Sequence, residues 1–162
     1  NLSRANLGRT DDELDAVYAA SIQFFTDLIP AAFEPALCAV RLHGDRAALP
    51  RPYLAAAEKR EATMGGSDFH INILAAYDAY DEVLAAAGRA RDEGCDLDAA
   101  LAIGTVDLVL RTTPEPLLSG FLPLQSQYAQ LVFLDTPLND LTMAQVDDLI
   151  ADHRRFPQLR GR

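Results

Sequence analysis

Strand-like and helix-like segments alternate along this 162-residue chain, and this alternation constrains the fold more than any other feature. Strands that are joined by helices pair in parallel, and a parallel sheet needs helices to cover its faces. Short apolar runs predict strands, namely 2–3, 38–42, 69–75, 106–110 and 131–134. Helical periodicity and capping residues predict helices, namely 10–28, 53–64, 78–93, 96–102 and 142–154. We therefore predict an α/β fold with a mostly parallel central sheet flanked by helices.

Length and composition narrow the class of protein. A chain of this length can bury about two-thirds of its unfolded surface in a single domain, so we expect one domain over residues 1–162. The net charge of −10 and the lack of a basic stripe argue against a nucleic-acid partner. Cys38 and Cys95 are far apart and have no metal-ligand spacing. Without a membrane-length apolar run or a visible signal peptide, we expect a cytoplasmic protein with at most peripheral membrane contact.

The clearest functional signal lies in residues 107–131, which read DLVLRTTPEPLLSGFLPLQSQYAQL. A buried-type strand here runs into a turn that places Arg111, Thr112, Thr113 and Ser119 at its carboxyl end. Ligands of open α/β sheets bind at the carboxyl ends of the strands. A forked guanidinium beside several hydroxyl groups suits a diphosphate. We therefore predict a diphosphate-binding site at Arg111, Thr112 and Ser119.

The same segment resembles the signature of the cis-prenyltransferases, the undecaprenyl and related polyprenyl diphosphate synthases, which contains R-[L/I]-S-x-F-L-[L]-W-Q-x-x-Y-x-E-[L]. Other blocks resemble the family in the same order. NLSRANLGR at residues 1–9 is similar to LS-x-E-N-x-x-R, and Gly44 with Asp45 matches G-[D/N]. NILAAYDAYDEV at residues 72–83 is similar to N-x-A-x-N-Y-G-G-R-x-E-[I], and residues 136–156 occupy the place of the helix that ends in R-R-F-G.

The resemblance implies a hydrophobic tunnel lined by helices, a dimer, and condensation of isopentenyl diphosphate with an allylic diphosphate in the presence of Mg²⁺. Carried over to this chain, it makes Asn6 and Arg9 catalytic residues near the reacting end. Arg111 and Ser119 would hold the second diphosphate. The tunnel wall would consist of aromatic and apolar side chains, namely Phe24, Phe25, Leu28 and Tyr77.

Several positions depart from the family pattern. The first strand of the family and its H-x-D-G-N-x-R-W diphosphate loop have no counterpart, so we expect a domain without them. Ala5 replaces a Glu, Leu117 replaces the second phosphate-binding Arg, Leu124 replaces the signature Trp, and residues 78–80 replace Gly-Gly-Arg. Gln130 stands where the family has a metal-ligand Glu. A neutral amide is a poor Mg²⁺ ligand, so the implied Mg²⁺ lacks a ligand there.

These residues leave two main functions open. The first is a prenyltransferase that condenses isoprenyl diphosphates or performs related irregular coupling or terpene-forming chemistry. The second is a catalytically weak partner subunit of a heteromeric cis-prenyltransferase. Retention of Asn6, Arg111 and Ser119 favours the enzyme, with allylic and isopentenyl-type diphosphates as ligands and a homodimer or a heterodimer as the assembly. A third possibility is a small α/β binding module with an anion pocket at Arg111.

Charged residues at helix ends have simpler explanations than a metal or phosphate site. Asp78, Asp81 and Glu82 begin a predicted helix, where carboxylates complement the helix dipole. His153 lies in the last turn of the final predicted helix, where a cation does the same. We predict structural roles for all four.

Overall fold

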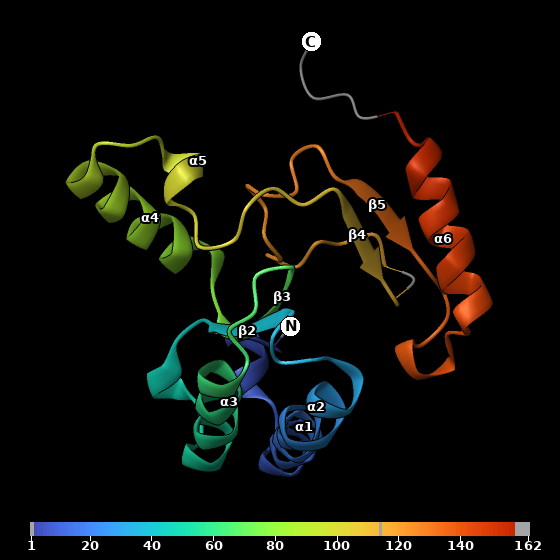
Figure 1. Ribbon diagram of the computed structural model, residues 1–162, viewed down its shortest axis with the longest axis horizontal. Coiled ribbons are helices and arrows are strands. Elements are labelled where there is room, and N and C mark those ends of the chain that lie inside the picture. The colour runs from blue at the N-terminus through green and yellow to red at the C-terminus, as the bar shows by residue number, and fades with distance from the viewer. Residues whose placement is uncertain (1, 114, 158–162) are drawn as a thin grey trace. The chain divides into compact units, whose positions relative to one another are not determined.

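The computed structural model in Figure 1 describes residues 2–113 and 115–157. The chain divides into two compact units, Asn1–Ala102 and Ile103–Arg162. Among the described residues, each unit has a sheet of its own, with three strands in the first and two in the second, and these strands pair in parallel. The predicted parallel pairing is therefore confirmed, whereas the expectation of one domain over residues 1–162 stays a prediction.

The sheet of the first unit has the strand order β1–β3–β2. Its strands are β1 (Leu2–Ser3), β2 (Cys38–His43) and β3 (Phe69–Tyr77). The register pairs His43 with Leu74, so β3 continues beyond the end of β2. Because the strands are parallel, their carboxyl ends and the residues that follow them lie at one edge of the sheet.

Helices α1 (Asp11–Gln23), α2 (Ile29–Ala32) and α3 (Arg51–Thr63) lie on the same side of this sheet (Figure 1). The predicted capping box at the start of α1 is present. The backbone nitrogen and the hydroxyl of Thr10 both donate to Oε2 of Glu13, over 3.2 and 3.0 Å. Such reciprocal capping satisfies amide groups that the first helical turn leaves unpaired.

The helix predicted over residues 10–28 is irregular near its end. A π turn at Phe24–Leu28 interrupts the helix between α1 and α2. Phe25 and Ile29 are completely buried, whereas Phe24 is 38% exposed and Leu28 is 56% exposed. Phe25 and Ile29 are four residues apart and face the core together, whereas Phe24 and Leu28 face away from it.

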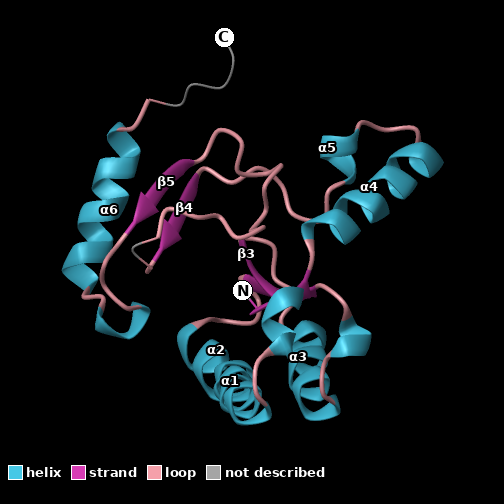
Figure 2. Cartoon of the chain, turned by 180° about the vertical axis from the view of Figure 1, so that it is seen from behind, coloured by secondary structure: helices cyan, strands magenta, loops and turns pink. Residues whose placement is uncertain are grey.

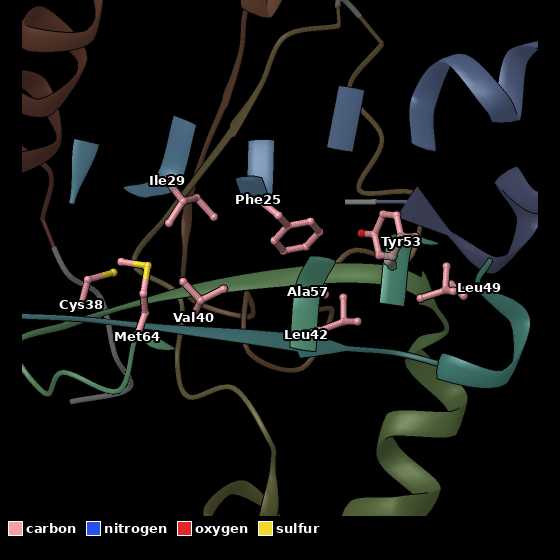
Figure 3. Close-up of a cluster of buried hydrophobic side chains, with 11 residues drawn as sticks. Phe25, Ile29, Cys38, Val40, Leu42, Leu49, Tyr53, Ala57 and Met64 are labelled. Atoms are coloured by element: carbon pink, nitrogen blue, oxygen red, sulfur yellow. The ribbon is translucent and has the colours of Figure 1, made fainter. Parts of the chain in front are cut away.

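The core of the first unit is an aromatic and aliphatic cluster between these helices and the sheet (Figure 3). The ring of Phe25 meets the ring of Tyr53 edge to face, with centroids 5.4 Å apart, and Tyr18 contacts the same Tyr53 at 5.8 Å. Such ring pairs contribute about 0.5–1.5 kcal/mol each beyond the area that they bury. Val40 and Leu42 supply the contacts from β2. This buried cluster thus fixes the position of the sheet whose carboxyl edge is described above.

The chain leaves β3 into helix α4 (Ala79–Glu93), which the sequence predicts correctly. The side chain of Asp78 caps this helix, and Gly94 ends it in the left-handed conformation. The short helix α5 (Leu97–Ala100) follows. Arg89 of α4 ties the two helices together, because its Nε and Nη2 donate to the last carbonyl oxygen of α5 over 3.0 and 2.8 Å.

The second unit contains strands β4 (Leu108–Arg111) and β5 (Gln130–Phe133) and helix α6 (Met143–Arg155). In Figure 2, α6 runs beside β5. Thr142 caps α6, as predicted, by accepting a hydrogen bond from the backbone nitrogen of Gln145. The predicted strand 106–110 begins two residues before β4 and ends one residue early. Short 3₁₀ turns complete the described structure, at Arg4–Gly8 (η1), Arg46–Ala48 and Leu138–Asp140.

Across the described residues, no helix combines the length and the apolarity that crossing a bilayer requires.

Candidate active site

A pocket of about 530 Å³ lies at the carboxyl edge of the three-stranded sheet. The residues that follow β2 and β3 line it, among them Gly44 and Asp45. Gly44 has φ +121°, and a Cβ atom there would come within 2.0 Å of the carbonyl oxygen of Ala75. Only glycine tolerates this combination of backbone angle and close approach. Gly44 is therefore required for the turn that brings Asp45 into the lining of the pocket.

The charges of this pocket are largely paired with one another. Arg4 of η1 forms ion pairs with Asp81 and, over 3.7 Å, with Asp45. The hydroxyl of Tyr77 donates to a carboxylate oxygen of Glu82. Burial raises the pKa of Tyr77 above its ordinary value, and the hydrogen bond to Glu82 raises it further.

The lining of this pocket is net acidic. It includes two guanidinium groups and four carboxylates, namely those of Arg4, Arg89, Asp45, Asp78, Asp81 and Glu82. An excess of negative charge disfavours a pyrophosphate by Coulomb repulsion. The prediction that Asp78 is a helix-start acid is confirmed. The sequence did not reveal that Asp81 and Glu82 also contact Arg4 and Tyr77 across the pocket.

A second pocket of the first unit, of about 230 Å³, brings together the two residues predicted to be catalytic. Asn6 and Arg9 both line it, beside apolar side chains that include Val17 and Ile73. Oδ1 of Asn6 accepts hydrogen bonds from the backbone nitrogen of Ser3, over 3.2 Å, and from the Ser3 hydroxyl. Among the described residues, no carboxylate lies within ion-pair distance of Arg9. A guanidinium beside an apolar wall suits an amphiphile with an anionic head.

The structure does not bring together the four residues predicted to line a tunnel. Phe25 belongs to the buried core, and Tyr77 lines the 530 Å³ pocket. Phe24 and Leu28 are exposed. A tunnel formed by these side chains stays a prediction.

In the second unit, the structure joins two of the residues predicted to bind a diphosphate. Arg111 is the last residue of β4, and its Nη1 donates to the carbonyl oxygen of Leu117 and, over 3.1 Å, to the hydroxyl of Ser119. Ser119 and the residue after it have positive φ angles, of +51° and +73°, which turn the loop at this point. Thr112 follows Arg111 directly. The hydroxyl of Thr113 is buried and has no hydrogen-bond partner among the described residues.

Gln130, at the position of the family's metal-ligand Glu, is already engaged. Its amide oxygen Oε1 lies 2.9 Å from Nδ1 of His153 on α6. Within the described ranges, no group of three or more His, Cys, Asp or Glu side chains could hold a metal ion. The side chain present at residue 130 therefore does not fit Mg²⁺, and we derive no chemical step through a metal.

Comparison with known proteins decides the family. The family described as "Putative undecaprenyl diphosphate synthase" matches residues 1–159. This chain belongs to that family of cis-prenyltransferases. Isoprenyl transferase 1 of Corynebacterium glutamicum is 31% identical to it over 156 residues, which cover 83% of this chain and 68% of the relative. Isoprenyl transferase of Streptococcus thermophilus is 30% identical over an alignment of 178 residues that covers 95% of this chain and 71% of the relative.

Solved structures agree with this assignment. The crystal structure of a probable undecaprenyl diphosphate synthase from Campylobacter jejuni is 25% identical to this cis-prenyltransferase, with a TM-score of 0.82. The match covers 99% of this chain and 80% of that one. The predicted family, the α/β fold and the class of activity, a prenyl diphosphate-processing transferase, are therefore confirmed.

Sequence reasoning missed the ion pairs of Arg4 with Asp45 and Asp81. The positions of the two aspartates relative to the predicted strands could have indicated these ion pairs. Asp45 follows the predicted strand 38–42 and Asp81 follows the predicted strand 69–75, each within a few residues. Parallel pairing brings the residues after neighbouring strands to one edge, where a cation that follows β1 can reach both carboxylates.

Proposed function

We propose that this chain transfers prenyl groups between allylic and isopentenyl-type diphosphates and that Arg111 binds a pyrophosphate group. One observation carries the proposal. The guanidinium of Arg111 is oriented by neutral acceptors, the Leu117 carbonyl and the Ser119 hydroxyl, and no described carboxylate lies within ion-pair distance of it. In a chain with a net charge of −10, an oriented cation without a carboxylate partner suits an anionic ligand.

The chemistry needs three things from the protein. When the allylic carbon–oxygen bond breaks, negative charge develops on the departing pyrophosphate, and positioned cations and hydrogen-bond donors stabilise it. Hydrogen-bond donors must also hold the second diphosphate, which stays intact, and Arg111, Thr112 and Ser119 offer such donors at one strand end. The cationic carbon left behind needs an apolar wall that excludes water until the new carbon–carbon bond to the isopentenyl unit forms and that unit loses a proton to restore a double bond. The pocket that holds Asn6 and Arg9 combines polar groups with such a wall.

The assembly and the metal belong to the proposal as well. We propose a homodimer or a heterodimer with a related subunit, and a cytoplasmic location. Mg²⁺ would reach this site with the diphosphates rather than through Gln130, because metal ions of this kind commonly bind substrate phosphates with few protein ligands.

The engaged side chain of Gln130 favours one alternative, a weakly active subunit that supports an active relative. A single assay separates the two. The purified chain is incubated with Mg²⁺, isopentenyl diphosphate, and geranyl or farnesyl diphosphate, with and without a related active subunit. We expect pyrophosphate release and a longer prenyl product from the chain alone. Release only with the added subunit would favour the alternative, and no contribution in either mixture would overturn the proposal.

A further inference from the structure

We propose that Arg4 is a positioning residue that holds the segment carrying Asn6 and Arg9 in place for prenyl transfer. The inference rests on the proposed function, in which these two residues contact the prenyl diphosphate. It concerns a residue outside the 230 Å³ pocket that they line.

The position of Arg4 lets one side chain join the ends of all three strands. Arg4 follows β1 directly, Asp45 follows β2, and Asp81 lies in the first turn of α4, just after β3. The sheet order is β1–β3–β2, so the carboxyl ends of the three strands are neighbours. The guanidinium of Arg4 pairs with Asp81 and, over 3.7 Å, with Asp45. We call this group of three residues the Arg4 clamp.

The two carboxylates of the Arg4 clamp are fixed independently of Arg4. Oδ1 of Asp45 accepts from the backbone nitrogen of Ala47 over 3.0 Å, and its own backbone nitrogen donates to the carbonyl oxygen of Ala76 over 3.2 Å. Asp81 is part of a helix whose start is capped by Asp78. Asp45 and Asp81 are therefore held in place by other contacts, and through Arg4 they position the segment that begins at that residue.

Just before that segment, Ser3 of β1 is held in the sheet by its pairing with Tyr77 of β3. None of the residues of η1 is fully buried, and Leu7 contacts the core only as a partly buried side chain. Internal hydrogen bonds make residues 3–9 one unit, because Asn6 accepts from Ser3 and its carbonyl oxygen accepts from the backbone nitrogen of Arg9 over 3.3 Å. The sheet pairing of Ser3 and the tie at Arg4 together set where Asn6 and Arg9 lie.

Arg4 is poorly suited to bind the diphosphate itself. Its charge is shared between two carboxylates, and the pocket beside it is net acidic. Its side chain is 42% exposed, and ion pairs this exposed contribute little to global stability. Loss of Arg4 should therefore disturb local position more than folding.

The experiment compares Arg4→Ala, Arg4→Lys and the exchange Arg4→Asp with Asp81→Arg against the wild-type chain. Arg91→Ala is the matched control, because Arg91 is an exposed arginine of α4 that pairs with its neighbour Asp92 over 2.8 Å. We expect Arg4→Ala to lower kcat roughly 10- to 100-fold, since small displacements of reacting groups cost this much, with KM nearly unchanged. Arg4→Lys should retain part of the rate that Arg4→Ala loses, and so should the exchange of Arg4 with Asp81. The control Arg91→Ala should have the kcat of the wild-type chain.

Hydrogen exchange of the peptide covering residues 2–10 gives a second readout that does not need activity. Arg4→Ala should speed its deuterium uptake, while the melting temperature stays close to that of wild type. Unchanged uptake, or an unchanged kcat in a chain that loses activity on Arg111→Ala, would overturn this inference alone. A raised KM with a normal kcat would also overturn it, because it would make Arg4 a substrate ligand. An inactive wild-type chain would instead overturn the proposed function, and hydrogen exchange would then decide the clamp.

Discussion

Nδ1 of His153 donates a hydrogen bond to the amide oxygen Oε1 of Gln130 over 2.9 Å. An amide oxygen can only accept, so the contact requires the tautomer with its proton on Nδ1. The bond joins the end of α6 to the first residue of β5 in part-buried surroundings. A position where the sequence resemblance predicts a metal ligand thus serves this chain as a structural contact.

His153→Ala should lower the free energy of unfolding by about 0.5–1.5 kcal/mol, the net value of a hydrogen bond of this kind. Urea denaturation measures the loss. Arg154→Ala is the control, because Arg154 is an exposed cation in the same last turn. Equal losses in both variants would favour the helix-dipole role predicted from the sequence over the hydrogen bond.

Phe25→Ala should cost about 3–5 kcal/mol of unfolding free energy, because it removes a completely buried ring from the core. Phe24→Ala should cost under about 1 kcal/mol, since that ring is 38% exposed. The neighbouring pair tests which of the two rings faces the core. Similar losses in the two variants would contradict the described register.

Gly44→Ala should destabilise the chain by at least about 1–3 kcal/mol, because it combines backbone strain at φ +121° with a collision against Ala75. Gly88→Ala is the control. A Cβ atom at Gly88 meets nothing within 4 Å, and alanine in a helix interior should stabilise by up to about 1 kcal/mol. Thermal denaturation of the two variants should shift in opposite directions, and a shared direction would refute this account of Gly44.

Alkaline pH should destabilise the fold through Tyr53. Burial, followed by the nearby Tyr18, raises the pKa of Tyr53 to about 12. Above the ordinary value of about 10, the unfolded chain loses this proton while the folded chain keeps it, so stability falls as pH rises from about 10 to 12. The loss should reach roughly 1–3 kcal/mol and shrink in Tyr53→Phe. Tyr128→Phe, at an exposed position, should leave the pH profile unchanged.

The structure also shows which features the sequence can predict. Local signals sufficed for the strands, for the capping residues Thr10 and Thr142, and for α4, because caps and periodicity act within a few residues. The π turn was missed because a periodic apolar pattern cannot show one inserted residue. The contact of Gln130 with His153 spans 23 residues and depends on how α6 packs, which no local pattern encodes.

For the candidate site, the sequence predicted neighbours only in part. Arg111 and Ser119, eight residues apart in the chain, meet across a loop, and their binding of a diphosphate stays a prediction. The sequence did not reveal the Arg4 clamp, because Arg4 and its two carboxylate partners meet only through the register of three parallel strands. Charges that pair across strand ends become visible only in three dimensions.

The most direct test of the central claim is calorimetric binding of inorganic pyrophosphate and of farnesyl diphosphate to the wild-type chain and to Arg111→Ala. Loss of a charged hydrogen-bond donor, worth about 1.5–3 kcal/mol, should weaken the binding of both ligands roughly 10- to 100-fold. Arg155→Ala, which removes an exposed arginine of the same unit, should bind both ligands as the wild type does. Equal affinities in wild type and Arg111→Ala would contradict the role of Arg111 as the pyrophosphate-binding group.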